Sequence, residues 1–328
     1  MNVKSDRTNL EQPFSENDLA KALNAITRQH GPYSAHNIKL SATIYTMNAR
    51  VNFDHFKLNR IKQILADLGC INKGARLLDI ASLESMFAIE FAAEGLAVTA
   101  IEGRENNLEK GRFAAKLLGL SSIEFFLDDV NNITPEKYGR FDIVLCMGIL
   151  YHIAKEKYAS FLKNVSDCCE GWLVIDTFVS LHAADGLEWQ GARYNGTTWR
   201  EFEDSANADE KKMNAHAALN NNLSFSMTKD SLMRFLRALG FTAVFEVQLP
   251  PQPNAPLDRV TLVCKRGVPV SLKVFPEFDQ SLDPEFIEDT RGIGEKNLVH
   301  WNESFAKRTL RRGFRIVRHK VRTLRKRT

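Results

Sequence analysis

The chain has 328 residues, of which 44% are hydrophobic, with 44 Lys and Arg against 40 Asp and Glu. This composition is that of a folded protein with one large core and excludes a fibrous or disordered chain. The polar first residues carry no apolar signal segment, and no apolar stretch is long enough to span a bilayer. The five cysteines show no C-x-x-C spacing, so we expect no disulfide framework, no bound metal and a cytoplasmic location.

Short apolar runs alternate with helical patterns along the first half of the chain. The predicted strands cover 77–80, 97–101, 123–126, 143–146 and 172–175, and the predicted helices 56–68, 84–94, 105–118 and 156–168. Strands that alternate with helices indicate βαβ units. We therefore predict an α/β fold with a doubly wound, mainly parallel sheet that binds ligands at the carboxyl ends of its strands.

A long polar stretch, residues 180–227, follows the fifth predicted strand. It sets Trp189, Tyr194 and Trp199 among Gly and Asn residues. A stretch of this length inside a compact enzyme is typical of a substrate loop or lid.

The sheet is predicted to end in an antiparallel hairpin. A helix over 231–239 stops at Gly240, and two strands over 241–247 and 259–264 flank a proline-rich turn. The predicted organisation is an N-terminal arm at 1–54, a main domain at 55–266 and a C-terminal extension at 267–328.

The net charge of +4 is unevenly distributed, because residues 307–328 hold eleven Lys and Arg and no acid. The remaining 306 residues hold 33 bases and 40 acids. Apolar residues recur in this tail at steps of four and three, at Leu310, Phe314, Val317, Val321 and Leu324. The pattern predicts a basic amphipathic helix that contacts an anionic membrane surface or packs on the acidic body, with RNA as a weaker alternative.

Acidic residues stand where three successive predicted strands end. Asp79 closes the first strand, before small residues that let backbone N–H groups approach a ligand. Glu102 ends the second, where a carboxylate can accept from both ribose hydroxyls, and Asp128 and Asp129 end the third, where one can accept from an adenine amino group. Singly, each acid could cap a helix or lie in a loop. Together they predict a nucleoside site, and the missing glycines argue against a dinucleotide dehydrogenase.

Four segments carry a resemblance to a known family: LLDIASLES (77–85), VTAIEGRE (98–105), FFLDDV (125–130) and FDIVLCMGILYH (141–152). Over about residues 55–266 the chain resembles the class I S-adenosylmethionine-dependent methyltransferases. The resemblance implies a Rossmann-like fold and S-adenosylmethionine as the cofactor. It implies contacts to the methionine part from Ala81, Ser82 and Leu83, to the ribose from Glu102 and to the adenine from Asp129. The predicted cofactor site also includes Asp79, Gly103, Asp128, Val130 and Met147.

The sequence departs from the family in the loop after the first strand. The family's loop is rich in glycine, whereas this chain has no glycine between Asp79 and Gly95. Alanine and serine favour negative φ, so we expect a loop of permitted conformation and weaker cofactor binding. A non-catalytic binding protein of the same fold is therefore retained as an alternative.

Methyl transfer requires an acceptor atom held in line with the methyl carbon, and a base where that atom is a hydroxyl. His152, at the exit of the fourth strand, is the first candidate for this base. Tyr151 is expected to line the acceptor pocket, and Asp176, at the end of the fifth strand, is a second candidate base. The alternatives are a packing or capping role for His152 and a strand-end hydrogen-bond acceptor for Asp176.

A narrower resemblance concerns the branch that contains the tRNA wobble-uridine carboxymethyl-transferring enzymes and unassigned bacterial methyltransferases of glycan and small-molecule pathways. It is carried by GILYH, Arg193-Tyr194, Asn222 and the segment 228–241. We expect a small-molecule, glycan or lipid-linked acceptor at the inner face of the membrane, with a tRNA-modifying enzyme as the alternative. In the unassigned enzymes, a segment like 31–46 covers the active site; here it could equally be a packed arm.

Overall fold

The structure is a computed structural model that describes residues 14–47, 53–248 and 256–267. The predicted tail helix at 307–328 lies outside these residues, so its structure stays a prediction. Within the described ranges, no helix combines the length and the apolar character that crossing a bilayer requires.

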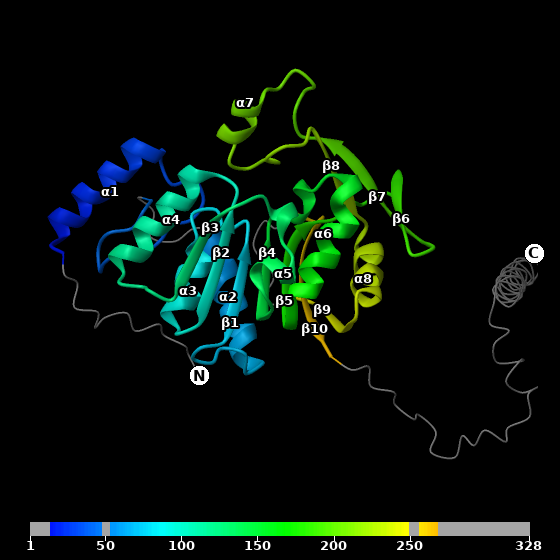
Figure 1. Cartoon of the computed structure of the whole chain (residues 1–328), viewed down its shortest axis with the longest axis horizontal. Coiled ribbons are helices and arrows are strands. Elements are labelled where there is room, and N and C mark those ends of the chain that lie inside the picture. The colour runs from blue at the N-terminus through cyan, green and yellow to red at the C-terminus, as the bar shows by residue number, and fades with distance from the viewer. Residues whose placement is uncertain (1–13, 48–52, 249–255, 268–328) are drawn as a thin grey trace, which may run out of the picture. The chain divides into compact units, whose positions relative to one another are not determined.

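A seven-stranded sheet forms the centre of the main domain, in the order β3-β2-β1-β4-β5-β10-β9 (Figure 1). The first five strands pair in parallel, and β10 is antiparallel to both β5 and β9. This confirms the predicted mainly parallel sheet with an antiparallel end. The strands are β1 (Arg76–Ile80), β2 (Ala97–Glu102), β3 (Ile123–Leu127), β4 (Phe141–Met147), β5 (Cys169–Phe178), β9 (Phe241–Glu246) and β10 (Arg259–Arg266).

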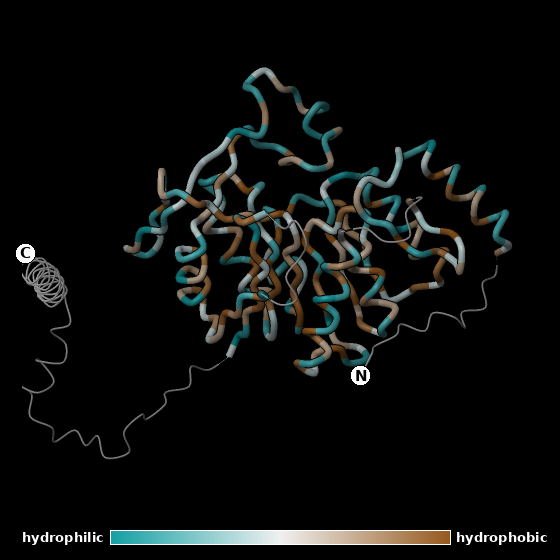
Figure 2. The backbone as a smooth tube through the Cα atoms, turned by 180° about the vertical axis from the view of Figure 1, so that it is seen from behind, coloured by the Kyte–Doolittle hydropathy of each residue, from teal (hydrophilic) through white to brown (hydrophobic). Residues whose placement is uncertain are grey.

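Helices cover both faces of this sheet. Successive side chains of a strand point to opposite sides, and both sets are apolar here, so each face must be buried. Leu77 belongs to the apolar cluster shared with α1 to α4, whereas Leu78 belongs to the cluster shared with α6 and α8. The strands accordingly appear as largely hydrophobic tubes in Figure 2. The helices are α1 (Glu16–His30), α2 (Phe53–Asp67), α3 (Met86–Ala93), α4 (Glu105–Leu117), α5 (Pro135–Tyr138), α6 (Lys155–Cys168), α7 (Ala208–Met213) and α8 (Lys229–Ala238), with 3-10 turns η2 (Val130–Asn132) and η3 (Leu150–His152).

The stretch at 180–227, predicted as a substrate loop, contains a second sheet. Its antiparallel strands are β6 (Asp185–Trp189), β7 (Ala192–Arg200) and β8 (Leu223–Met227). Gln190 and Gly191 join β6 to β7 with φ values of 48° and 77°, as a tight hairpin turn requires. The sequence signal was the Gln-Gly pair between Trp189 and a segment rich in aromatic residues and threonine. Only the connection from β7 to β8, which carries α7, is a long polar segment.

Helix α1 was not predicted from the polar N-terminal sequence. Ser15 caps it, since its hydroxyl accepts the Asp18 N–H at 3.2 Å. Its one fully buried side chain is Leu19. The helix brings residues 31–47 to the main domain, where they reach the candidate site.

Candidate functional site

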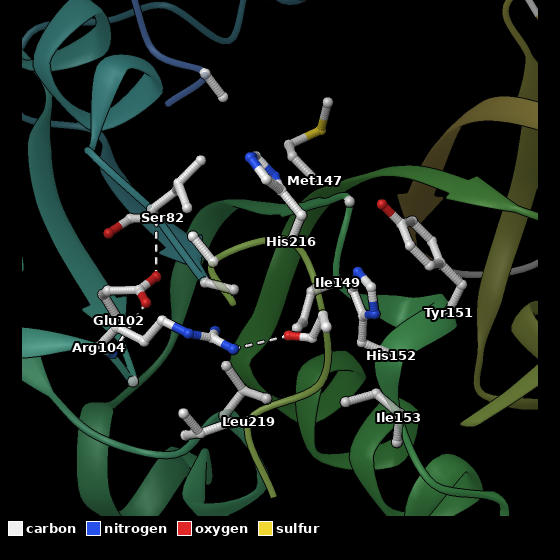
Figure 3. Close-up of a pocket in the computed structure, with 18 of the residues that line it drawn as sticks. Ser82, Glu102, Arg104, Met147, Ile149, Tyr151, His152, Ile153, His216 and Leu219 are labelled. Atoms are coloured by element: carbon white, nitrogen blue, oxygen red, sulfur yellow. Dashed lines mark hydrogen bonds between the residues drawn. The ribbon is translucent and has the colours of Figure 1, made fainter. Parts of the chain in front are cut away.

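A cavity of about 330 Å³ opens at the carboxyl ends of β1, β2 and β4. Strand order reverses here, since β1 neighbours both β2 and β4, and doubly wound sheets bind their ligands at this point. Of the thirteen predicted site residues, Asp128 and Asp176 do not line the cavity. The others do (Figure 3): Asp79, Ala81, Ser82, Leu83, Glu102, Gly103, Asp129, Val130, Met147, Tyr151 and His152.

Glu102, at the end of β2, is held by two backbone donors. Its Oε2 accepts the N–H of Leu83 and its Oε1 that of Arg104, both at 2.9 Å. Burial raises the pKa of Glu102, and these two hydrogen bonds oppose the rise. Oε2 keeps a further lone pair, and Oε1 also accepts from Asn107 Nδ2 at a long 3.5 Å, a contact that a hydroxyl can replace.

The loop between β1 and α3 contains three non-glycine residues in the left-handed region: Ala81 (φ 55°), Leu83 (φ 51°) and Ser85 (φ 64°). The expectation of negative φ values in this loop is therefore wrong. Tertiary hydrogen bonds fix the conformation, including the Ser82 N–H to the Ile101 carbonyl at 2.9 Å. The loop keeps a glycine-type path and stores strain of about 1–2 kcal/mol per residue.

Replacing Ala81 by glycine should relieve part of this strain. We expect Ala81→Gly to increase the free energy of unfolding by about 1 kcal/mol, measured by urea denaturation. Ala93→Gly is the matched control, because Ala93 is exposed in α3, where glycine should destabilise by about 0.5–1 kcal/mol. If both variants lost the same free energy of unfolding, the strain at Ala81 would be contradicted.

Asp79 lies at the base of the cavity and is 2% exposed. Burial raises its pKa from 3.8 to about 7; the N–H of Ala88, at 3.2 Å, opposes this shift and the carboxylate of Glu102 adds to it. Between pH 4 and 7 the folded chain thus holds a proton that the unfolded chain has released. Stability contributed by this proton is present below this window and is lost as the pH rises through it.

Asp79→Asn removes this titration. We expect the variant to gain stability relative to the wild type between pH 5 and pH 8, because the asparagine never takes a buried charge. Urea denaturation of both ligand-free proteins at the two pH values checks this expectation. A difference in unfolding free energy that is the same at both pH values would contradict it.

Asp128, predicted at the adenine end, belongs instead to the turn after β3. Its Oδ2 accepts from Lys137 Nζ and from the Tyr138 hydroxyl, each at 2.5 Å. Burial would raise the pKa of Asp128, but these contacts lower it to about 2. Its carboxylate is committed to the turn, which disfavours a contact to the cofactor.

Asp129 lines the cavity together with Asn131, a residue that the sequence analysis missed. Asp129 Oδ1 accepts from Asn131 Nδ2 at 2.7 Å, and its Oδ2 accepts from Asn220 Nδ2 at 2.7 Å. The buried amide oxygen of Asn131 has no hydrogen-bond partner among the described residues. An unpaired buried acceptor at this position suits an adenine amino group.

The N-terminal segment forms one wall of the cavity. Glu84, which is fully buried, accepts three consecutive backbone N–H groups of residues 34–36, at 2.6–3.2 Å, and Lys110 Nζ at 2.9 Å. His36 also accepts the N–H of Met86, at the start of α3, through Nδ1 at 3.2 Å. Ala35 and His36 line the cavity. These contacts fix the segment to the strained loop.

His152 lies at the opposite end of the cavity from Glu102 (Figure 3). Its Nδ1 is 2.7 Å from Oε1 of Glu201, whose side chain is 1% exposed. The carboxylate accepts a hydrogen bond from the Nδ1–H group, which favours the tautomer whose Nε2 carries no proton and can accept one. Tyr151 packs beside the imidazole with ring centroids 4.2 Å apart, and burial raises the pKa of the Tyr151 hydroxyl.

Asp176 sits behind this end of the cavity in an ionic cluster. It pairs with Lys57 at 3.5 Å, accepts from Arg259 Nε at 2.8 Å and from the Thr261 hydroxyl at 2.9 Å. Burial would raise the pKa of Asp176, but Lys57 and Arg259 lower it below its usual range. These contacts favour a role in orienting the two cations, which line the cavity, over that of a base.

A family model of the methyltransferase domain matches residues 53–246, more than half of the chain. The chain belongs to this family. Together with the nucleoside geometry, this identifies a class I S-adenosylmethionine-dependent methyltransferase. No curated protein sequence matches the methyltransferase at a significant level.

Solved structures of EvdMO1 share the fold at low sequence identity. Its N-terminal domain with SAH bound matches 79% of this methyltransferase and 100% of that chain, at 18% identity and a TM-score of 0.60. The same domain in the presence of SAH and D-fucose matches with 76% and 97% coverage, 18% identity and a TM-score of 0.59. At this identity the likeness shows the fold alone.

The residues of the cavity fit S-adenosylmethionine, which is the cofactor. Glu102 presents a fixed carboxylate for a ribose, and Asn131 an unpaired acceptor for an adenine. The loop of Ala81 and Leu83 exposes backbone to the same cavity, since both residues line it. The glycine-free loop thus follows a backbone path with positive φ values, which glycine adopts without strain.

Proposed function

We propose that the enzyme transfers the methyl group of S-adenosylmethionine to a hydroxyl of a small-molecule, glycan or lipid-linked acceptor. One observation carries the proposal: a single cavity joins the nucleoside acids at one end to His152 at the other. His152 in turn lies against a buried carboxylate. The predicted cytoplasmic location and membrane contact of 307–328 remain part of this proposal.

S-adenosylmethionine supplies a methyl group on a positively charged sulfur. In the proposed reaction, Glu102 and the 81–83 loop hold the cofactor, and Nε2 of His152 accepts the proton of the acceptor hydroxyl. Tyr151 and Trp199 flank the imidazole, with ring centroids 4.2 and 6.3 Å from it. Tyr151 lines the cavity beside the imidazole and limits water there, so positioning and desolvation lower the barrier.

The similarity to an EvdMO1 domain crystallised with SAH and D-fucose supports a sugar hydroxyl as the acceptor class. The test is SAH formation with three acceptor panels: deoxysugars and nucleotide sugars, aromatic hydroxyl compounds, and unmodified tRNA. We expect turnover with the sugar panel. Turnover with tRNA and with neither other panel would show that the acceptor is tRNA and not a sugar. A folded protein that binds no cofactor would support the non-catalytic alternative.

Transfer of a carboxymethyl group is a second candidate function. Lys57 and Arg259 line the cavity, and Tyr151 is hydrogen-bonded to Arg259. Cations at the end of the cavity that holds His152 suit a carboxylate, as a carboxylated cofactor would carry. Mass spectrometry of the modified acceptor, with each cofactor supplied separately, distinguishes a methyl from a carboxymethyl product.

A further inference from the structure

Residues 211–221 form a closing segment over the cofactor end of the cavity. Ala215 to Ala217 and Leu219 to Asn221 line the cavity, and Figure 3 shows His216 beside Met147 and Leu219 beside Arg104. A Cβ on Gly103 would lie 2.6 Å from Leu219 Cδ2, so the segment packs directly on the residue that follows Glu102.

Arg104 is the main anchor of the closing segment. The two hydrogens of its Nη2 are donated mainly to the backbone carbonyls of Asn214 at 2.7 Å and Ala217 at 2.9 Å, and the carbonyls of Lys211 and Ala218 lie at 3.1 and 3.4 Å. Its Nε donates to the Lys212 carbonyl at 3.1 Å. One guanidinium therefore contacts several carbonyls of the segment through two nitrogens held in a fixed planar geometry.

Glu201 connects the closing segment to His152. Its Oε2 accepts the N–H of Ala218 at 2.6 Å, and its Oε1 accepts from Nδ1 of His152 at 2.7 Å and from the Ser224 hydroxyl at 2.5 Å. The peptide group between Ala217 and Ala218 thus accepts from Arg104 through the Ala217 carbonyl and donates to Glu201 through the Ala218 N–H. A continuous chain of hydrogen bonds leads from the residue beside the ribose acid to the imidazole.

We infer that the closing segment positions the base: Arg104 fixes the segment, the segment fixes Glu201, and Glu201 fixes the ring and tautomer of His152. The inference rests on the proposed role of His152 as the base. Arg104 and Glu201 are positioning residues, since neither is assigned a contact to the reacting atoms. The base is therefore correctly oriented only when the segment is closed over the cofactor end.

The physical reason is the cost of leaving a buried carboxylate without donors. When the segment opens, Oε2 of Glu201 loses the Ala218 N–H, while Oε1 keeps its contacts to His152 and Ser224. The carboxylate then rotates to bring Oε2 to water or another donor, so the ring and tautomer of His152 are no longer held in one geometry. Proton transfer is thereby restricted to the closed state.

A double-mutant cycle on the full-length enzyme tests the chain of contacts. It compares Arg104→Ala, Glu201→Gln and the combined variant for kcat, for KM of the acceptor and for the dissociation constant of S-adenosylmethionine. We expect each single change to lower kcat about 10-fold or more, with KM of the acceptor within about 3-fold. In the Glu201→Gln background, the Arg104 change should add no more than about 2-fold.

Arg200→Ala is the matched control, because Arg200 is the last residue of β7, directly before Glu201, and pairs at 2.7 Å with the exposed Asp204. Its kcat should equal that of the wild type. The inference would be overturned if the Arg104 and Glu201 changes multiplied in their effects on kcat. It would also be overturned if the Arg104 change altered only the affinity for the cofactor. If Arg104→Ala does not fold, Arg104→Lys replaces it, since lysine keeps the charge without the fork.

The same series separates this inference from the proposed function. If the His152→Asn variant keeps the kcat of the wild type, His152 is not the base. If the His152 variant loses activity while the Arg104 and Glu201 substitutions change kcat independently of each other, His152 remains the base. Only the positioning by the closing segment is then refuted.

Discussion

Replacing Glu102 by alanine should weaken S-adenosylmethionine binding about 100-fold. Two hydrogen bonds from ribose hydroxyls to a charged acceptor contribute about 1.5 kcal/mol each or more, and each 1.4 kcal/mol is a factor of ten in the dissociation constant. The change also leaves the N–H groups of Leu83 and Arg104 without their acceptor. Isothermal titration with the cofactor and with SAH measures the effect.

Glu124→Ala provides the control for this measurement. Glu124 is an exposed carboxylate on β3, next to β2, and it does not line the cavity. Its loss should leave the affinity unchanged. If the folded Glu102 variant bound the cofactor as tightly as the Glu124 variant, the nucleoside site would have to lie elsewhere.

His152→Asn should lower kcat by about 10²–10⁴ while leaving cofactor affinity within about 2-fold. The asparagine amide can still donate to Glu201, so the buried carboxylate keeps a partner, but the acceptor nitrogen Nε2 is gone. The loss therefore isolates proton transfer from packing. Steady-state kinetics with the acceptor found in the screen, and titration with SAH, measure the two quantities.

His182→Asn is the corresponding control, because His182 is exposed and lies outside the cavity. Full activity of the His152 variant would exclude the imidazole as the base. A joint loss of cofactor binding and activity would point to a role in the structure of the site.

The sequence was sufficient to predict the elements that build the cavity. Apolar runs separated by helical patterns placed β1 to β5 within a few residues, and the acid at the end of each early strand marked the ligand edge of the sheet. These signals are local, because buried parallel strands and their helices differ in periodicity. The position of Glu102 followed from the strand end alone, and the structure places it in the cavity.

The side chains that work through distant partners could not be predicted in this way. Glu201 is 49 residues from His152 along the chain, and Arg104 is more than 100 residues from the carbonyls that it binds. No spacing rule relates such positions. Asn131 was missed for a different reason, since only the structure shows that its amide oxygen is buried without a described partner.

The strained loop shows how tertiary structure overrides local preference. Alanine, leucine and serine each disfavour a positive φ, yet Ala81, Leu83 and Ser85 adopt it. The Glu102 carboxylate and the Ile101 carbonyl accept N–H groups of this loop, and Gly111 leaves room for Ser85. The combined contacts outweigh a local cost of about 1–2 kcal/mol per residue.

By itself, the sequence determined the sheet and the acids at the edge where the cavity lies, because periodicity and strand ends are properties of neighbouring residues. The tertiary structure decided the path of the glycine-free loop, the partner of His152 and the anchoring of residues 211–221. These features depend on burial and on hydrogen bonds between residues far apart in the chain. Such contacts exist only after the two sheets and the N-terminal segment have packed together.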